Sequence, residues 1–160
     1  MREYEYDRNA AVAYARKWAL GRNPAFYDFG NIGGDCTNFA SQCIYAGCGV
    51  MNTSPLYGWF YFSTNDRTPS WTGVQFLHNF LVNNDSVGPF AQVTDVRNAE
   101  LGDIVQLGNA DGEFYHSPVV VGKRDGRIYI AAHSYDALDK PLDSYNYAQT
   151  RVLHILGFRK

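Results

Sequence analysis

Residues 31–47 read Asn-Ile-Gly-Gly-Asp-Cys-Thr-Asn-Phe-Ala-Ser-Gln-Cys-Ile-Tyr-Ala-Gly, and this stretch decides the fold. Its first five residues are polar or glycine-rich, which is typical of an extended entry segment. The rest carries four residues on one face at helical spacing, namely Phe39, Ala40, Cys43 and Ile44. Gly47 is a natural helix stop. The pattern predicts a buried helix that begins at Cys36.

Helices are predicted before this stretch and after it, and strands follow them. Asp7 can cap a helix over about residues 8–20, and Ser70 can cap one over about residues 71–82. Beyond Gly88 the pattern changes to short strands, predicted over residues 103–107, 114–122, 127–133 and 151–158. Asp125-Gly126 is a strong hairpin signal. Helices followed by an antiparallel meander predict the α+β class.

Length and charge limit the kinds of protein that this chain can be. A length of 160 residues fits one domain over residues 1–160. The 14 Lys and Arg against 16 Asp and Glu give a net charge of −2, so no nucleic-acid or anionic-membrane partner is expected. No apolar run is long enough to insert into a membrane. Residues 1–6 lack the apolar core of a signal peptide, which leaves open a cytoplasmic protein or a domain of an exported one.

The three cysteines are too few, and odd in number, for a disulfide scaffold. Cys36 is placed where the positive end of a helix dipole favours a thiolate nucleophile. The alternative is an inert buried thiol. Cys43 is expected in the core, and Cys48 in a turn after the helix.

A thiolate nucleophile needs a base that lies near it in space. His78 and His154 are expected to be structural or exposed. His116 opens an apolar strand, nine residues before the Asp-Gly turn, and His133 ends the next strand, seven residues after it. This count places both rings at one end of the sheet on one face, with His116 as the base and His133 accepting its other N–H.

Two other interpretations of these histidines stay open. They can be a cross-strand pair in the core or on the surface. With Cys36 they can also supply three zinc ligands. No locally paired metal-ligand spacing is present, so no metal and no cofactor is expected.

Several motifs resemble known cysteine peptidases. Residues 34–39, Gly-Asp-Cys-Thr-Asn-Phe, resemble the signature around the nucleophile of the NlpC/P60 and CHAP peptidases. Residues 101–105 and 116–122 are similar to the two strands that follow it in those families. Over nearly its whole length the chain more closely resembles the putative amidase domain family, a papain-like relative.

The resemblance implies a papain-like, NlpC/P60-type α+β fold, with the nucleophile helix packed on a C-terminal antiparallel sheet. It makes Cys36 the nucleophile, His116 the base and His133 the third residue, with Asp136 a less favoured substitute. The implied activity is hydrolysis of amide or peptide bonds in bacterial cell-wall peptidoglycan through an acyl-enzyme. A non-catalytic cell-wall-binding module on the same fold remains an alternative.

Four residues are candidates for substrate binding. By analogy with the NlpC/P60 peptidases, Asp35 meets a substrate amine, and its alternative role is to cap the helix. Trp59, Tyr61 and Trp71 are expected to line the cleft and stack on peptide or sugar, and their alternative place is the core. The sequence sets neither the bond that is cleaved nor the oligomeric state.

Overall fold

The computed structural model describes residues 1–160, which form four α-helices and ten strands. The helices are α1 (Arg8–Trp18), α2 (Cys36–Cys48), α3 (Pro69–Thr72) and α4 (Val74–Asn83). The strands are β1 (Glu3–Tyr4), β2 (Tyr61–Ser63), β3 (Asp66–Arg67), β4 (Gly88–Thr94), β5 (Ile104–Gly108), β6 (Phe114–His116), β7 (Val119–Arg124), β8 (Arg127–Ala132), β9 (Ala137–Pro141) and β10 (Gln149–Arg159).

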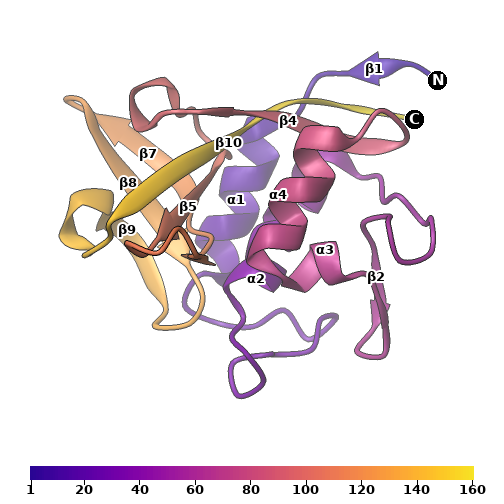
Figure 1. Cartoon of the computed structure of the whole chain (residues 1–160), viewed down its shortest axis with the longest axis horizontal. Helices are drawn as coiled ribbons and strands as arrows, with labels where there is room; N and C mark the ends of the chain where they lie inside the picture. Colours follow the sequence, from indigo (N-terminus) through magenta and orange to yellow (C-terminus); the bar gives the residue numbers. More distant parts are fainter.

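Eight strands form one curled antiparallel sheet, and β2 and β3 form a separate small ribbon. The main sheet runs β1-β10-β5-β7-β8-β9, with β4 paired to β10 and β6 paired to β5. Helices α1, α2 and α4 lie together beside this sheet (Figure 1). The α+β prediction is confirmed.

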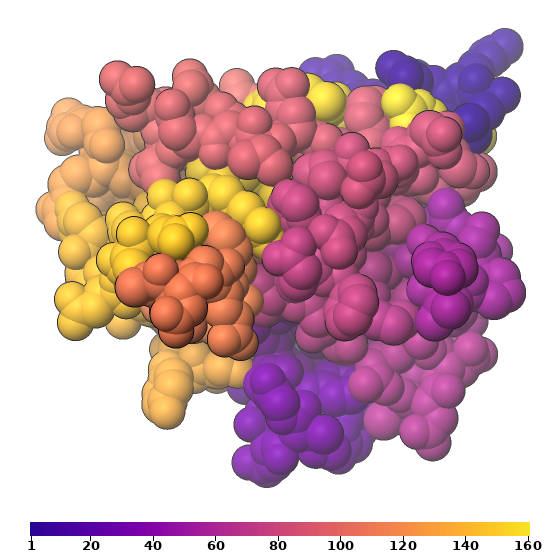
Figure 2. All heavy atoms as spheres, in the orientation of Figure 1, coloured from indigo at the N-terminus to yellow at the C-terminus, as the bar shows by residue number.

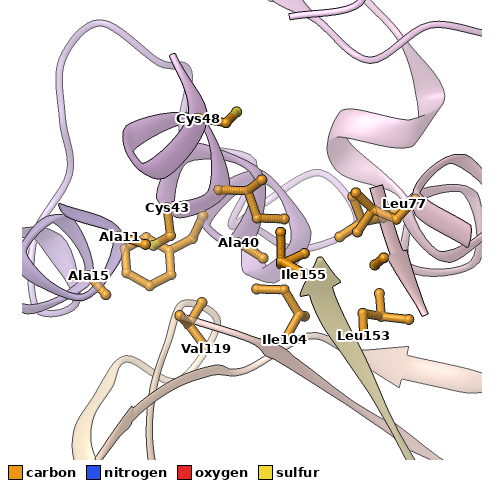
Figure 3. Close-up of a cluster of buried hydrophobic side chains, with 14 of the residues drawn as sticks. Ala11, Ala15, Ala40, Cys43, Cys48, Leu77, Ile104, Val119, Leu153 and Ile155 are labelled. Carbon is orange, nitrogen blue, oxygen red and sulfur yellow. The ribbon is translucent and has the colours of Figure 1, made fainter. Parts of the chain in front are cut away.

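The strands bury side chains on both faces of the sheet. On the helix side, Ile104 and Val119 pack against Ala40 and Cys43 of α2 (Figure 3). On the other side, residues of alternate register, such as Val105 and Val120, form a second apolar cluster. The middle of α2 is therefore packed against the central strands β5 and β7.

The helix predictions are confirmed for α1 and α2, and the helix predicted over residues 71–82 is confirmed in part. Asp7 caps α1 by accepting the Ala10 N–H at 2.9 Å. The third predicted helix is divided into α3 and α4, because Gly73 is extended between them, with φ −111° and ψ 130°. Ser70 caps neither piece, since its hydroxyl donates to the Gly58 carbonyl at 2.6 Å.

The strand predictions differ from the structure mainly at one proline. The hairpin at Asp125-Gly126 is confirmed, and both turn residues have positive φ. The single strand predicted over 114–122 is divided into β6 and β7 at Ser117-Pro118, where the proline has no N–H to pair. Strands β4 and β9 were not predicted.

The longest helix, α2, has 13 residues, and none of the helices combines the length and the apolar character that a membrane span requires.

A buried carboxylate attaches α1 to the sheet. Asp103, at the entry to β5, is fully buried. Its side chain accepts hydrogen bonds from Arg8 of α1 at 2.7 Å and from His154 of β10 at 2.8 Å. It also accepts the backbone N–H groups of Glu100 and Ile155. Four donors from three parts of the chain therefore depend on one residue.

We predict that Asp103→Ala lowers the free energy of unfolding by about 3–5 kcal/mol, because it leaves the buried donors without an acceptor. Urea unfolding followed by circular dichroism measures this change. Asp143→Ala, which breaks an exposed pair with Arg127, is the control and should change stability little. Equal effects of the two variants would contradict this role for Asp103.

Candidate active site

Cys36 is the first residue of α2 and is partly exposed. Its sulfur lies 3.7 Å from the Thr37 hydroxyl. Burial raises the pKa of this thiol, whereas hydrogen bonds from the Thr37 hydroxyl and from the backbone N–H groups of Ser117 and Thr37 lower it. The Asp35 carboxylate also raises it. The N–H groups near the helix start do favour the thiolate, as expected, but burial outweighs them and the net pKa of the thiol is raised.

Asp35 is buried directly before the nucleophile, with 1% of its surface exposed. Its Oδ1 accepts the Phe29 N–H at 2.8 Å and the Asn38 side-chain amide at 2.9 Å. Its Oδ2 lies 2.5 Å from Nδ1 of His133. Asp35 stands at the N-cap position of α2 but makes no capping hydrogen bond. Neither role expected from the sequence, binding a substrate amine or capping the helix, fits this arrangement. The carboxylate is buried, and both of its oxygens are hydrogen-bonded within the protein.

His133 follows β8 and is as buried as Asp35. Its Nε2 lies 2.8 Å from the Trp18 carbonyl, which can only accept, so Nε2 carries a proton. Its Nδ1 is hydrogen-bonded to the Asp35 carboxylate at 2.5 Å. The ring also stacks on Phe39 of α2, with ring centroids 4.0 Å apart.

These contacts correct the role predicted for His133. Neither of its ring nitrogens has a lone pair free to accept an N–H from His116, so it does not orient that residue. His133 instead holds Asp35 and the first turn of α2. Asp136, the substitute considered for the third position, pairs with Arg22 at 2.9 Å.

His116 ends β6, and its neighbour Ser117 approaches the Cys36 thiol through the backbone N–H. The imidazole lies beside Tyr145, with ring centroids 5.8 Å apart. Burial, and then the charge of Lys140, lowers the pKa of His116 to about 4. No hydrogen bond joins His116 to Cys36 or to His133. The structure thus brings together the thiol and the backbone next to His116, and it does not form the predicted triad.

The aromatic residues predicted for the cleft lie in the core. Trp59 and Trp71 have no exposed surface, and Tyr61 has 7%. Trp71 donates from its indole N–H to Asn38 at 2.9 Å, and Trp59 donates to Ser41, also on α2. These rings support the nucleophile helix from behind, as the core alternative proposed.

The cysteine predictions are partly correct. Cys43 is fully buried, as expected. Cys48 is the last residue of α2 and not part of a turn, because the helix continues to Gly49, which adopts the left-handed conformation that ends it.

The main hollows of the surface do not include the residues around Cys36. In Figure 2 the purple loop before α2 and the orange segment that contains β6 both reach the surface beside the magenta of α4. Three cavities of about 630, 580 and 360 Å³ lie elsewhere, and neither Cys36 nor His116 lines them. No group of three or more His, Cys, Asp or Glu side chains is arranged to hold a metal ion, so Cys36, His116 and His133 do not converge as zinc ligands.

Sequence reasoning missed two sets of residues around the nucleophile. Arg22 lies between three carboxylates, those of Asp28, Asp35 and Asp136. Three uncharged side chains, Thr37, Gln106 and Ser117, form a buried chain of hydrogen bonds from the thiol. The adjacency of Thr37 to Cys36 and of Ser117 to His116 is a local signal for the second set, and no local pattern indicates the first.

The family model of the putative amidase domain matches residues 5–156. The chain belongs to the putative amidase domain family. Amide hydrolysis is the activity that this family name suggests.

Two relatives of this amidase-family chain come from Bacillus subtilis (strain 168), and both are uncharacterized proteins. YhbB is 32% identical over 139 residues, which are 85% of this chain and 44% of YhbB. YjcM is 25% identical over 144 residues, which are 85% of this chain and 32% of YjcM. The chain thus spans less than half the length of either relative. No solved structure matches it.

We predict that Asp35→Ala lowers the free energy of unfolding by about 3–5 kcal/mol, because His133 and two N–H donors lose a buried acceptor. Chemical unfolding measures the loss. Asp28→Ala is the matched control, since Asp28 also contacts Arg22 but is half-exposed, and its effect should stay below about 1 kcal/mol. If Asp35→Ala behaves like this control, the buried pair does not stabilise the site.

We predict that His116 stays neutral until the pH approaches 4. An unfolded chain protonates this ring near pH 6.5 and the native chain near pH 4, so the unfolded state binds more protons between them. Stability should therefore rise with pH across this window, and less so in His116→Asn. Titration of the ring signals by NMR checks the assignment, and a midpoint near 6.5 would refute it.

Proposed function

We propose that this domain is a thiol-dependent hydrolase that cleaves an amide or peptide bond of bacterial cell-wall peptidoglycan through an acyl-enzyme. One observation carries the proposal. The Cys36 thiol, at the first residue of a buried helix, lies beside the backbone N–H of the residue that follows His116, in a chain of the putative amidase domain family.

The proposed base has to leave its resting position to reach the nucleophile. The Cα atoms of His116 and Ser117 are adjacent in the chain and so about 3.8 Å apart. The ring in its resting position contacts Tyr145 and makes no hydrogen bond that would hold it there. Catalytic contacts are often loose before substrate binds, so the resting geometry is compatible with this step.

In the proposed reaction the Cys36 thiol gives its proton to neutral His116 as the sulfur attacks the substrate carbonyl. The C–N bond then breaks, and the amine leaves with the proton from His116. Water, deprotonated by His116, hydrolyses the thioester and restores the thiol. The first N–H groups of α2 have no partner within the helix, and that of Cys36 is the proposed oxyanion donor.

Asp35 and His133 act in this proposal as positioning residues, because they hold the start of α2 and touch no substrate. Gly33 and Gly34 have positive φ, and a side chain at Gly33 would meet no atom within 4 Å. The loop before the thiol therefore leaves room for a substrate backbone.

The papain-like fold and the cell-wall substrate rest on resemblance. A helix that carries the thiol at its start and packs on an antiparallel sheet supports the NlpC/P60-type assignment. The motifs at residues 34–39 and 116–122 support a peptidoglycan substrate.

We predict that the protein releases soluble fragments from purified peptidoglycan, measured by chromatography and mass spectrometry. Cys36→Ser should abolish release, and His116→Ala should slow it by about 10²–10⁴-fold. Cys48→Ser, which changes a thiol remote from the site, should retain the wild-type rate. Iodoacetamide should label Cys36 ahead of the buried Cys43.

Three results would reject the proposal. Wild-type rates in Cys36→Ser would exclude the nucleophile. Binding to peptidoglycan without fragments would favour the non-catalytic module. Stoichiometric zinc in the purified protein, lost in Cys36→Ser, would favour the metal site.

A further inference from the structure

A line of three buried polar side chains leads from the Cys36 sulfur into the core. Thr37 Oγ1 lies 3.7 Å from the sulfur, and Ser117 Oγ lies 3.1 Å from Thr37 Oγ1. Gln106 Nε2 lies 3.2 Å from Ser117 Oγ. All three residues are at most 1% exposed, so each hydroxyl depends on its neighbours in the protein for hydrogen bonds.

The orientation of Gln106 fixes the direction of this line. Arg151 Nε, which can only donate, lies 2.8 Å from Oε1, so that atom is the amide oxygen. The amide nitrogen then faces the Val74 carbonyl at 2.9 Å and Ser117 Oγ. Its two N–H groups are both used, and Ser117 receives one of them.

The directions of the Ser117 and Thr37 hydroxyl protons follow from the orientation of Gln106. Ser117 accepts from Gln106, and its own proton is free for Thr37. Thr37 then accepts from Ser117 and has one proton left, which faces the sulfur. Every donor in the line has an acceptor in this arrangement, and the line ends with a donor at Cys36.

We propose that Gln106, Ser117 and Thr37 form a one-way chain of hydrogen bonds that stabilises the thiolate of Cys36. They are positioning residues, since Thr37 acts through the sulfur, Ser117 acts through Thr37, and Gln106 acts through Ser117. Hydrogen bonds to a charged acceptor are stronger than those to a neutral one, so the chain favours the ionised sulfur over the thiol. The proposal deepens the proposed hydrolase function. It rests on that function only in taking the thiolate to be the nucleophile of the reaction.

The experiment measures the thiol itself and needs no substrate. The pKa of Cys36 is determined from ultraviolet thiolate absorbance and from the pH dependence of iodoacetamide labelling, with Cys36→Ala as the blank. Thr37→Val keeps the side-chain shape and removes the last donor, so the pKa should rise by about one unit, which is a tenfold loss of thiolate at neutral pH. Thr37→Ser restores the hydroxyl and should restore the pKa.

Variants further along the line test its direction. Gln106→Glu replaces the donor by a carboxylate that accepts from Ser117, which turns the chain away from the sulfur and should raise the pKa. Gln75→Glu is the matched control, because Gln75 also accepts from Arg151, at 3.0 Å, but is exposed and outside the chain. Thr37→Val combined with Ser117→Ala should raise the pKa no more than Thr37→Val alone, since either change interrupts the same chain.

An unchanged pKa in a folded Thr37→Val protein, checked by circular dichroism, would overturn the proposal, as would equal shifts in Gln106→Glu and Gln75→Glu. These outcomes are separate from the proposed hydrolysis. If the pKa shifts are as expected and no fragments are released, the hydrogen-bond chain is supported and the hydrolase function is rejected. If fragments are released and the pKa shifts are absent, the hydrolase function is supported and the hydrogen-bond chain is rejected.

Discussion

The position of the nucleophile depends on the buried carboxylate of Asp35. Its partners come from three segments: the Phe29 N–H from the preceding loop, the Asn38 amide from α2, and His133 from the end of β8. A carboxylate without exposed surface is stable only when its oxygens are fully bonded, so these segments must meet in one arrangement. Cys36 is the next residue in the chain, and its location follows from theirs.

The negative charge of the same carboxylate disfavours ionisation of the Cys36 sulfur beside it. Asp35 and burial both raise the pKa of the Cys36 thiol, while the nearby N–H groups and the Thr37 hydroxyl lower it. Burial keeps His116 neutral as well. The resting site therefore holds a neutral thiol near a neutral imidazole. A thiol of high pKa is also the better nucleophile once its proton is removed, so this arrangement suits a reaction in which the proton leaves during attack.

Features that depend on neighbouring residues were predictable from the sequence, and those that depend on distant ones were not. Helical spacing placed α2 and Cys36, although the helix passes through the predicted stop at Gly47 and ends at Gly49. The Asp-Gly turn placed the hairpin of β7 and β8. The pairing of Asp35 with His133 joins residues 98 positions apart, and no local pattern carries it. A buried Trp71 and a cleft-lining tryptophan also look alike in sequence, since both are large and apolar with one N–H to satisfy.

The β-bulge between Val120 and Gly122 explains why the histidine count failed, because a register shift of one residue moves the residues before it to the opposite face relative to β8. Side chains alternate between the faces of a strand, and Ser117 shares the helix-facing side with Val119, so its hydroxyl meets Thr37 of α2. His116 belongs to the other side, where Tyr145 packs beside the second apolar cluster. His116 is the last residue of β6 and pairs with Leu107 of β5, so the proposed mechanism requires this end of the strand to rearrange before the imidazole can meet the thiol.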